Sequence, residues 1–167
     1  KKLKRNKGVG FCRNLALKYS TSKYVAFIDS DDIWEREKLK KQIELMDSNN
    51  FDFTYTDFAT FKGSKNDKKI IKTIYLPEQF TYEMFVKKTS ICTSSMVIRR
   101  KKIGLTKFLR TKICEDYFFK CKLLKNCDEA INIGESLTLY RISKNSLQSN
   151  KFKNIYWVWY INNKFNK

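Results

Sequence analysis

The sequence predicts an α/β fold in which helices flank a mainly parallel sheet, with mixed strands later in the chain. Apolar runs typical of strands alternate with segments whose apolar residues recur at helical spacing. The first such run, Tyr24–Ile28, is apolar at every position, as in parallel strands buried on both faces. With 167 residues, the chain fits one domain that buries a sizeable core.

Two helices are expected around this first strand. Gly8-Val9-Gly10 leads into a helical segment over residues 11–19, which ends at a Ser-Thr-Ser sequence. After the strand, Asp32 is expected to cap a second helix at about residues 33–47. Glu35 would then occupy the third helical position and complete a capping box.

The rest of the chain alternates shorter strands and helices. Strands are expected at 51–55, 70–76, 94–99 and 137–140, helices at 81–88, 116–125 and 152–165, and loops at 63–69 and 104–112. The last helix is basic and contains Tyr156, Trp157, Trp159 and Tyr160. Aromatic residues at helical spacing usually belong to a core, which is the favoured interpretation. The alternative is a face that lies on a membrane.

Composition limits the possible functions. The chain carries 35 Lys and Arg against 17 Asp and Glu, a net charge of +18. This favours either attraction to anionic lipid or a phosphate-bearing substrate, or a solvated basic face without a specific partner. No stretch of eighteen apolar residues and no apolar leader is found, so neither a membrane span nor secretion is expected. Five cysteines without histidine indicate free thiols rather than zinc or disulfides.

Three aspartates within four residues follow the first strand. Asp29, Asp31 and Asp32 would repel one another unless a cation or hydrogen-bond donors compensate their charge. In extended backbone Asp29 and Asp31 project to the same side, where their oxygens can share a divalent ion. For Asp32, helix capping is a sufficient explanation.

Three further groups of residues have both a functional and a structural interpretation. Gly8-Val9-Gly10 with Arg13 can cradle a phosphate at a helix start, or form a simple turn. Glu115-Asp116 can supply a general base, or favour a helix N-terminus through its dipole. Arg141 can hold a diphosphate, or lie on the surface at a strand end. The sequence leaves each choice open.

In this order, the motifs resemble family 2 glycosyltransferases, the GT-A fold enzymes that build bacterial surface polysaccharides. The most specific match is Gly8 to Asn14, then Tyr24-Val-Ala-Phe-Ile-Asp-Ser-Asp-Asp-Ile-Trp34 and Lys38-Leu-Lys-Lys-Gln42. Ser94 to Arg99, Glu115-Asp116 and Tyr140-Arg141 follow in the family's order. The resemblance extends over about residues 4–149.

The resemblance implies roles for individual residues. Asp31 would bind a divalent metal, Mg²⁺ or Mn²⁺, and Asp29 would contact the nucleotide ribose or assist the metal. Asp116 would be the catalytic base, with Glu115 positioning acceptor or donor. The remaining donor-site residues would be Arg13 and Arg141, near the phosphates, together with Asn14 and Gly8.

The resemblance also implies an activity. The enzyme would transfer a sugar, with inversion, from a nucleotide-sugar donor to a hydroxyl of a surface polysaccharide or lipid-linked glycan. It would act in the cytoplasm or peripherally on the inner face of the cell membrane, in contact with anionic lipid. A basic nucleic-acid-binding domain and an inactive glycosyltransferase fragment are the alternatives, and a metal-dependent phosphodiesterase is a weaker one.

One departure from the family is large. The family begins with a strand–turn–helix unit and a second strand with its own acidic cluster, which hold the base and ribose of the nucleotide. This chain opens just before the family's third helix. Residues 1–150 are therefore expected to form a GT-A domain without its N-terminal third, and residues 151–167 a C-terminal aromatic, basic helix.

Overall fold

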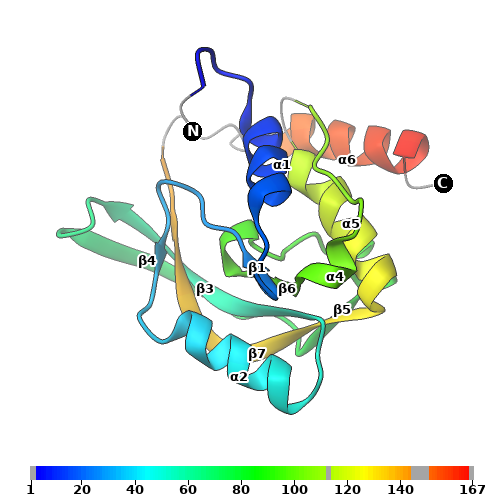
Figure 1. Cartoon of the computed structure of the whole chain (residues 1–167). Coiled ribbons are helices and arrows are strands. Elements are labelled where there is room, and N and C mark those ends of the chain that lie inside the picture. Colours follow the sequence, from blue (N-terminus) through cyan, green and yellow to red (C-terminus); the bar gives the residue numbers. More distant parts are fainter. Residues whose placement is uncertain (1–2, 112–113, 144–150, 166–167) are drawn as a thin grey trace.

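The computed structural model describes residues 3–111, 114–143 and 151–165 (Figure 1). The helices are α1 (Val9–Tyr19), α2 (Lys38–Ser48), α3 (Tyr82–Lys87), the 3₁₀ turn η1 (Thr93–Ser95), α4 (Arg100–Ile103), α5 (Glu115–Cys127) and α6 (Lys151–Phe165). The strands are β1 (Tyr24–Ala26), β2 (Ile33–Trp34), β3 (Phe53–Gly63), β4 (Lys68–Ile74), β5 (Gln79–Thr81), β6 (Val97–Arg99) and β7 (Glu129–Arg141).

In the described ranges the strands form one seven-stranded sheet in the order β1-β6-β3-β7-β2, with β4 added to β3 and β5 added to β7. The long strands β3 and β7 pair in parallel, and the other pairings are antiparallel. The sheet is thus mixed, as expected, but less parallel than expected. One reason is that β4 follows β3 after only four residues, and so short a connection makes an antiparallel hairpin.

Helices cover both faces of the sheet (Figure 1). On one face, α2 brings Gln42 against Thr54 of β3. On the other, Phe53 and Tyr55 of β3 join a core that includes Phe119 of α5. Side chains of β3 therefore alternate between α2 and the main core, as the pleat of a strand requires.

The first predicted strand is correct in position but wrong in direction. β1 is antiparallel to β6, with Tyr24 opposite Arg99, and it ends at Ala26 rather than Ile28. An apolar run indicates that a strand is buried, but not whether the neighbouring strand is parallel or antiparallel to it. Beyond the strand, Phe27 remains buried because its ring packs against Phe108 and Phe119, with centroid distances of 5.3 and 5.7 Å.

The predicted capping box at Asp32 is also wrong. Ile33 and Trp34 form β2, which pairs with β7, and the Glu35 N–H extends this pairing to the Leu137 carbonyl. The backbone is therefore extended where a capping box needs a helix, and α2 begins only at Lys38. The buried residues of this helix are Lys38, Gln42 and Met46.

The other predicted elements are present with different lengths. Helices predicted at 81–88, 116–125 and 152–165 correspond to α3, α5 and α6. The strand predicted at 137–140 is the end of β7, which begins at Glu129. The loop at 104–112 is confirmed to Thr111, and Lys112 lies outside the described residues. All five cysteines are free, and Cys121 and Cys127 are buried.

Candidate active site

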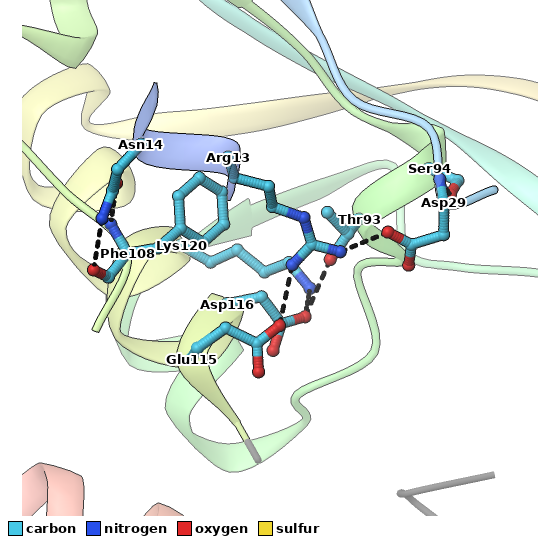
Figure 2. A network of polar contacts seen from close by, with 9 residues as sticks. All are labelled: Arg13, Asn14, Asp29, Thr93, Ser94, Phe108, Glu115, Asp116 and Lys120. Atoms are coloured by element: carbon cyan, nitrogen blue, oxygen red, sulfur yellow. Dashed lines mark hydrogen bonds and ion pairs between the residues drawn. The ribbon is translucent and has the colours of Figure 1, made fainter. Parts of the chain in front are cut away.

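The side chain of Arg13 joins two segments that are distant in the sequence (Figure 2). From α1, its guanidinium donates to the carboxylate of Asp29, after β1, and to Glu115 of α5 at 2.8 Å. Only 12% of the Arg13 side chain is exposed. Burial alone would lower the pKa of Arg13, but the charge and hydrogen bond of Asp29, with Asp116 and Glu115, raise it. Arg13 is therefore a permanent cation between two carboxylates.

Gly10 allows α1 to lie close enough for this contact. A Cβ at Gly10 would be 2.3 Å from the backbone oxygen of Leu109 and 3.4 Å from Cγ of Glu115. No side chain fits at such a distance. Close packing is therefore a sufficient reason for a glycine at this position, and a phosphate-binding role is not needed to explain it. Gly8 has a different role, since it precedes α1 with a φ of +83°.

Asn14 anchors α1 to the segment before α5. Its side-chain amide donates to the Phe108 carbonyl at 2.9 Å, and its side-chain oxygen accepts from the Phe108 N–H at 2.8 Å (Figure 2). The amide of Asn14 thus makes a reciprocal pair with one backbone unit. The pair keeps Phe108 against the helix that carries Arg13.

The aspartate cluster forms a turn rather than an extended segment. The Asp32 N–H donates to the Asp29 carbonyl at 3.0 Å. The hydroxyl of Ser94 accepts from the Asp29 N–H at 3.0 Å and donates to the Asp32 carboxylate at 2.5 Å. The prediction of extended backbone from Asp29 to Asp31 is therefore wrong. Asp29 points to Arg13, whereas Asp31 is exposed.

Asp32 is buried beneath this turn. In addition to Ser94, its carboxylate accepts from the backbone N–H of Arg141 at 3.0 Å. Burial raises the pKa of Asp32 to about 6, although both hydrogen bonds act in the opposite direction. Asp32 thus ties the turn to the end of β7.

Asp116 lies in the first turn of α5 with two donors. The Lys120 ammonium donates to its carboxylate at 2.6 Å, and the Thr93 hydroxyl donates to the same oxygen at 2.7 Å. Burial would raise the pKa of Asp116, but the charge and hydrogen bond of Lys120, with Thr93, hold it well below its usual range. By contrast, burial and the Asp116 charge raise the pKa of neighbouring Glu115.

These groups line one cavity of about 260 Å³. Its lining includes both carboxylates of the Glu115-Asp116 pair, Arg13 and Asp29, so the structure brings together four of the predicted site residues. The other lining residues are Phe58, Thr89, Ser90, Ile91, Cys92, Thr93, Lys120 and Tyr140. The cavity therefore combines an acidic wall with two buried cations.

Four other predicted residues do not line this cavity: Gly8, Asn14, Asp31 and Arg141. The guanidinium of Arg141 donates to the backbone oxygens of Asp31, at 2.8 Å, and of Gly63. Arg141 thus holds the acidic turn from its outer side, and the adjacent residue Tyr140 reaches the cavity.

Sequence reasoning missed Thr93, Ser94 and Lys120. For Lys120 a signal exists, because an acid and a lysine four residues apart on a helix face form a pair. The Thr-Ser-Ser run before β6 also marks a turn rich in hydroxyl groups. Nothing in the sequence, however, indicates that Thr93 and Ser94 reach two different acidic segments.

A divalent cation fits this site only with help from a substrate. Among the described residues, no group of three or more His, Cys, Asp or Glu side chains is placed to hold a metal ion. Magnesium is often held by one or two carboxylates together with substrate phosphates and water rather than by a complete protein cage. The exposed carboxylate of Asp31, with that of Asp29 on the same turn, is compatible with this arrangement.

Comparison with known proteins identifies the family. The model of "Glycosyl transferase family 2" matches residues 1–104, more than half of the chain. The chain belongs to glycosyltransferase family 2. This establishes the resemblance on which the site residues were predicted.

Two curated family 2 relatives match almost the whole chain. WfgD of Escherichia coli, named as a UDP-Glc:α-D-GlcNAc-diphosphoundecaprenol β-1,3-glucosyltransferase, is 36% identical over 92% of this chain and 59% of its own length. TuaG of Bacillus subtilis (strain 168), named as a teichuronic acid biosynthesis glycosyltransferase, is 33% identical over 95% of this chain and 62% of its own length. The chain therefore spans about three fifths of the length of these relatives.

A solved structure supports the fold. S. aureus TarS 1-349 in complex with UDP-GlcNAc superposes with a TM-score of 0.71 and 20% identity. The match covers 93% of this chain and 46% of TarS. At this identity the likeness establishes the GT-A-like α/β fold alone. Among the described residues, no helix combines the length and hydropathy needed to cross a bilayer.

Proposed function

We propose that this family 2 glycosyltransferase domain transfers a sugar from a nucleotide-sugar donor to a hydroxyl of a surface polysaccharide or lipid-linked glycan. The observation that carries the proposal is the cavity that Arg13, Asp29, Glu115 and Asp116 line together. It places the end of β1 beside the start of α5. Names of relatives, including WfgD with its lipid-linked acceptor, support the donor and acceptor classes.

The donor diphosphate lies on the side of the acidic turn. Asp31 and Asp29 would hold a Mg²⁺ or Mn²⁺ ion, whose positive charge would neutralise the leaving nucleoside diphosphate. Arg13 is a second positive charge near these phosphates. Arg141 supports the turn through the Asp31 carbonyl, and Gly8 and Asn14 contribute by fixing α1.

Asp116 accepts the proton of the acceptor hydroxyl as this oxygen attacks the anomeric carbon in line, which inverts its configuration. Because Lys120 holds its pKa low, Asp116 is ionised at neutral pH and is a weak base. Proton transfer therefore comes late, when bonding to carbon has already made the hydroxyl acidic. Glu115, fixed by Arg13, orients the acceptor or donor beside it.

The proposed acceptor also suggests where the protein acts. A lipid-linked glycan is confined to a membrane, and nucleotide sugars are cytoplasmic, so the chain would work in the cytoplasm or peripherally on the inner face of the cell membrane. The net charge of +18 suits a surface of anionic headgroups.

The proposal is tested by a screen of nucleotide sugars with Mn²⁺ or Mg²⁺, in which released nucleoside diphosphate is measured. We expect cation-dependent turnover that Asp31→Ala abolishes. Asp67→Ala is the matched control, because Asp67 is an exposed carboxylate on the turn between β3 and β4. Equal turnover in Asp31→Ala and wild type would reject the assigned role of Asp31.

The same samples test the rival functions. A nucleic-acid-binding domain would bind oligonucleotides equally well after Asp31→Ala, and binding would fall about 10³–10⁵-fold between 50 and 200 mM salt. An inactive fragment would fold and bind neither donor nor oligonucleotide. Either result would replace the proposed transferase.

A further inference from the structure

We propose that the outward face of α6 docks on an anionic lipid bilayer and holds the active site beside it. Among the side chains of this helix that the structure describes, three large apolar ones are exposed: Ile155 at 67%, Tyr156 at 56% and Trp159 at 61%. Ile155 and Trp159 are four residues apart and therefore lie above one another on the helix. Tyr156 extends the same face. We call these three residues the α6 ridge.

The α6 ridge lies opposite the face that packs on the protein. Ile161 is fully buried in the main core, and Val158 and Tyr160 pack against that core. A surface helix needs only one apolar face to dock on its own domain. The second apolar face, rich in aromatic rings, is thus unexplained by folding.

Charge identifies the kind of partner. The helix contains Lys151, Lys153 and Lys164 but no Asp or Glu. By helical spacing, Lys153 and Lys164 flank the side of the ridge on which Tyr156 lies, and both are exposed. Aromatic rings with flanking lysines suit the headgroup region of a membrane, and each lysine near an anionic surface strengthens the attraction. The net charge of +18 acts in the same direction.

The inner side of α6 borders the candidate active site. Asn154 and Val158 line a small cavity of about 120 Å³ together with Asp116 and Lys120. One helix therefore has the proposed base on one side and the ridge on the other. In Figure 1 it lies at the edge of the molecule, next to α5. Docking would bring the proposed base close to a lipid-linked acceptor, and this consequence rests on the proposed function.

The inference is tested by sedimentation with phosphatidylcholine vesicles, with and without phosphatidylglycerol. We expect wild type to bind the anionic vesicles, and Ile155→Ser/Trp159→Ser to reduce the partition coefficient by at least about tenfold. The control is Ile71→Ser/Tyr75→Ser, which removes two exposed apolar side chains on and after β4, a strand on the other side of the molecule from α6 (Figure 1). It should bind like wild type.

Tryptophan fluorescence gives an independent measurement. Brominated lipids should quench emission in wild type and in Trp157→Phe, but much less in Trp159→Phe. Equal binding by the ridge variant, no binding by wild type, or equal binding to neutral vesicles would overturn the inference. So would a concentration-dependent dimer that Ile155→Ser/Trp159→Ser abolishes, because a second copy would then cover the ridge.

The outcome is separable from that of the proposed function. If vesicle binding fails while turnover of a nucleotide sugar persists, docking is wrong and the transferase stands. If the ridge binds vesicles but no nucleotide sugar is turned over, the transferase is wrong and the docking surface stands.

Discussion

Five charged side chains line the candidate active site, and their net charge affects which ligand the site can bind. Arg13 and Lys120 are cationic, whereas Asp29, Glu115 and Asp116 are acidic. The wall is therefore more negative than positive, and an anionic diphosphate would be repelled without a further cation. This supports the proposed divalent metal. The sequence predicted Arg13 and the three acids, but not that Arg13 pairs with two of them, because such contacts join residues 16 and 102 positions apart.

Gly10 offers a test of the packing that positions Arg13. Gly10→Ala would place a methyl group against the Leu109 carbonyl, and a rigid backbone atom cannot yield easily. We expect a loss of about 1–3 kcal/mol in the free energy of unfolding, with reduced turnover because α1 shifts. Urea denaturation followed by circular dichroism measures it.

Val9→Ala is the control for this substitution, since Val9 precedes Gly10 in α1 and is 41% exposed. It should change stability little. A Gly10→Ala protein as stable and active as wild type would show that α1 need not approach the segment before α5 so closely.

At the scale of elements, the short turn η1 connects both acidic segments. Thr93 reaches Asp116, and Ser94 reaches Asp29 and Asp32. The turn is held from behind by β2 and α2: Trp34 Nε1 donates to the Ser94 carbonyl at 2.6 Å, and Gln42 donates to the Ser95 carbonyl at 3.1 Å. A helix in the region of α2 was predictable, whereas β2 was not, because a strand of two residues is too short to show an alternating pattern.

Lys38 supports this arrangement at a cost in stability. It is fully buried; its ammonium donates to Gln42 at 2.7 Å and lies 4.4 Å from the centre of the Trp34 ring. Burial lowers the pKa of Lys38 from 10.5 to about 7. The folded state thus binds this proton more weakly than the unfolded chain. Burial of the charged Lys38 therefore destabilises the fold fully below about pH 7. This destabilisation decreases as the pH rises toward 10.5.

Lys38→Met should therefore change how stability depends on pH. Relative to wild type, the variant should be most stable near pH 6, and this advantage should shrink by about 1–3 kcal/mol by pH 9. Urea denaturation at both pH values measures the difference. Lys40→Met, at an exposed position of the same helix, should show no such trend. A pH-independent difference for Lys38→Met would mean that Lys38 stays protonated in the fold.

At the scale of the whole molecule, the sequence predicted an α/β layer because the spacing of apolar residues indicates which side chains of a helix or strand are buried. It could not give the direction of β1, since Val25 is buried equally well beside a parallel or an antiparallel neighbour. It also could not give the full length of β7, whose first half includes Gly134 and pairs with β5. For the aromatic residues of α6 the sequence favoured a place in the core over a membrane-facing surface. The helix has both kinds of residue, since Tyr160 packs against the core and Trp159 is exposed.

The central claim is that one cavity contains both the acidic turn and a working base at Asp116. Asp116→Asn alone would leave Lys120 buried without its counter-charge, a loss of about 3–5 kcal/mol. A better comparison therefore sets Asp116→Asn/Lys120→Met against Lys120→Met alone. Circular dichroism should show that both are folded.

The decisive measurement is kcat for sugar transfer with these two variants at saturating donor and Mn²⁺. We predict that adding Asp116→Asn to Lys120→Met lowers kcat by about 10²–10⁴-fold, with donor KM nearly unchanged. Equal kcat values in the two folded variants would contradict the account, because the acceptor proton would then go elsewhere.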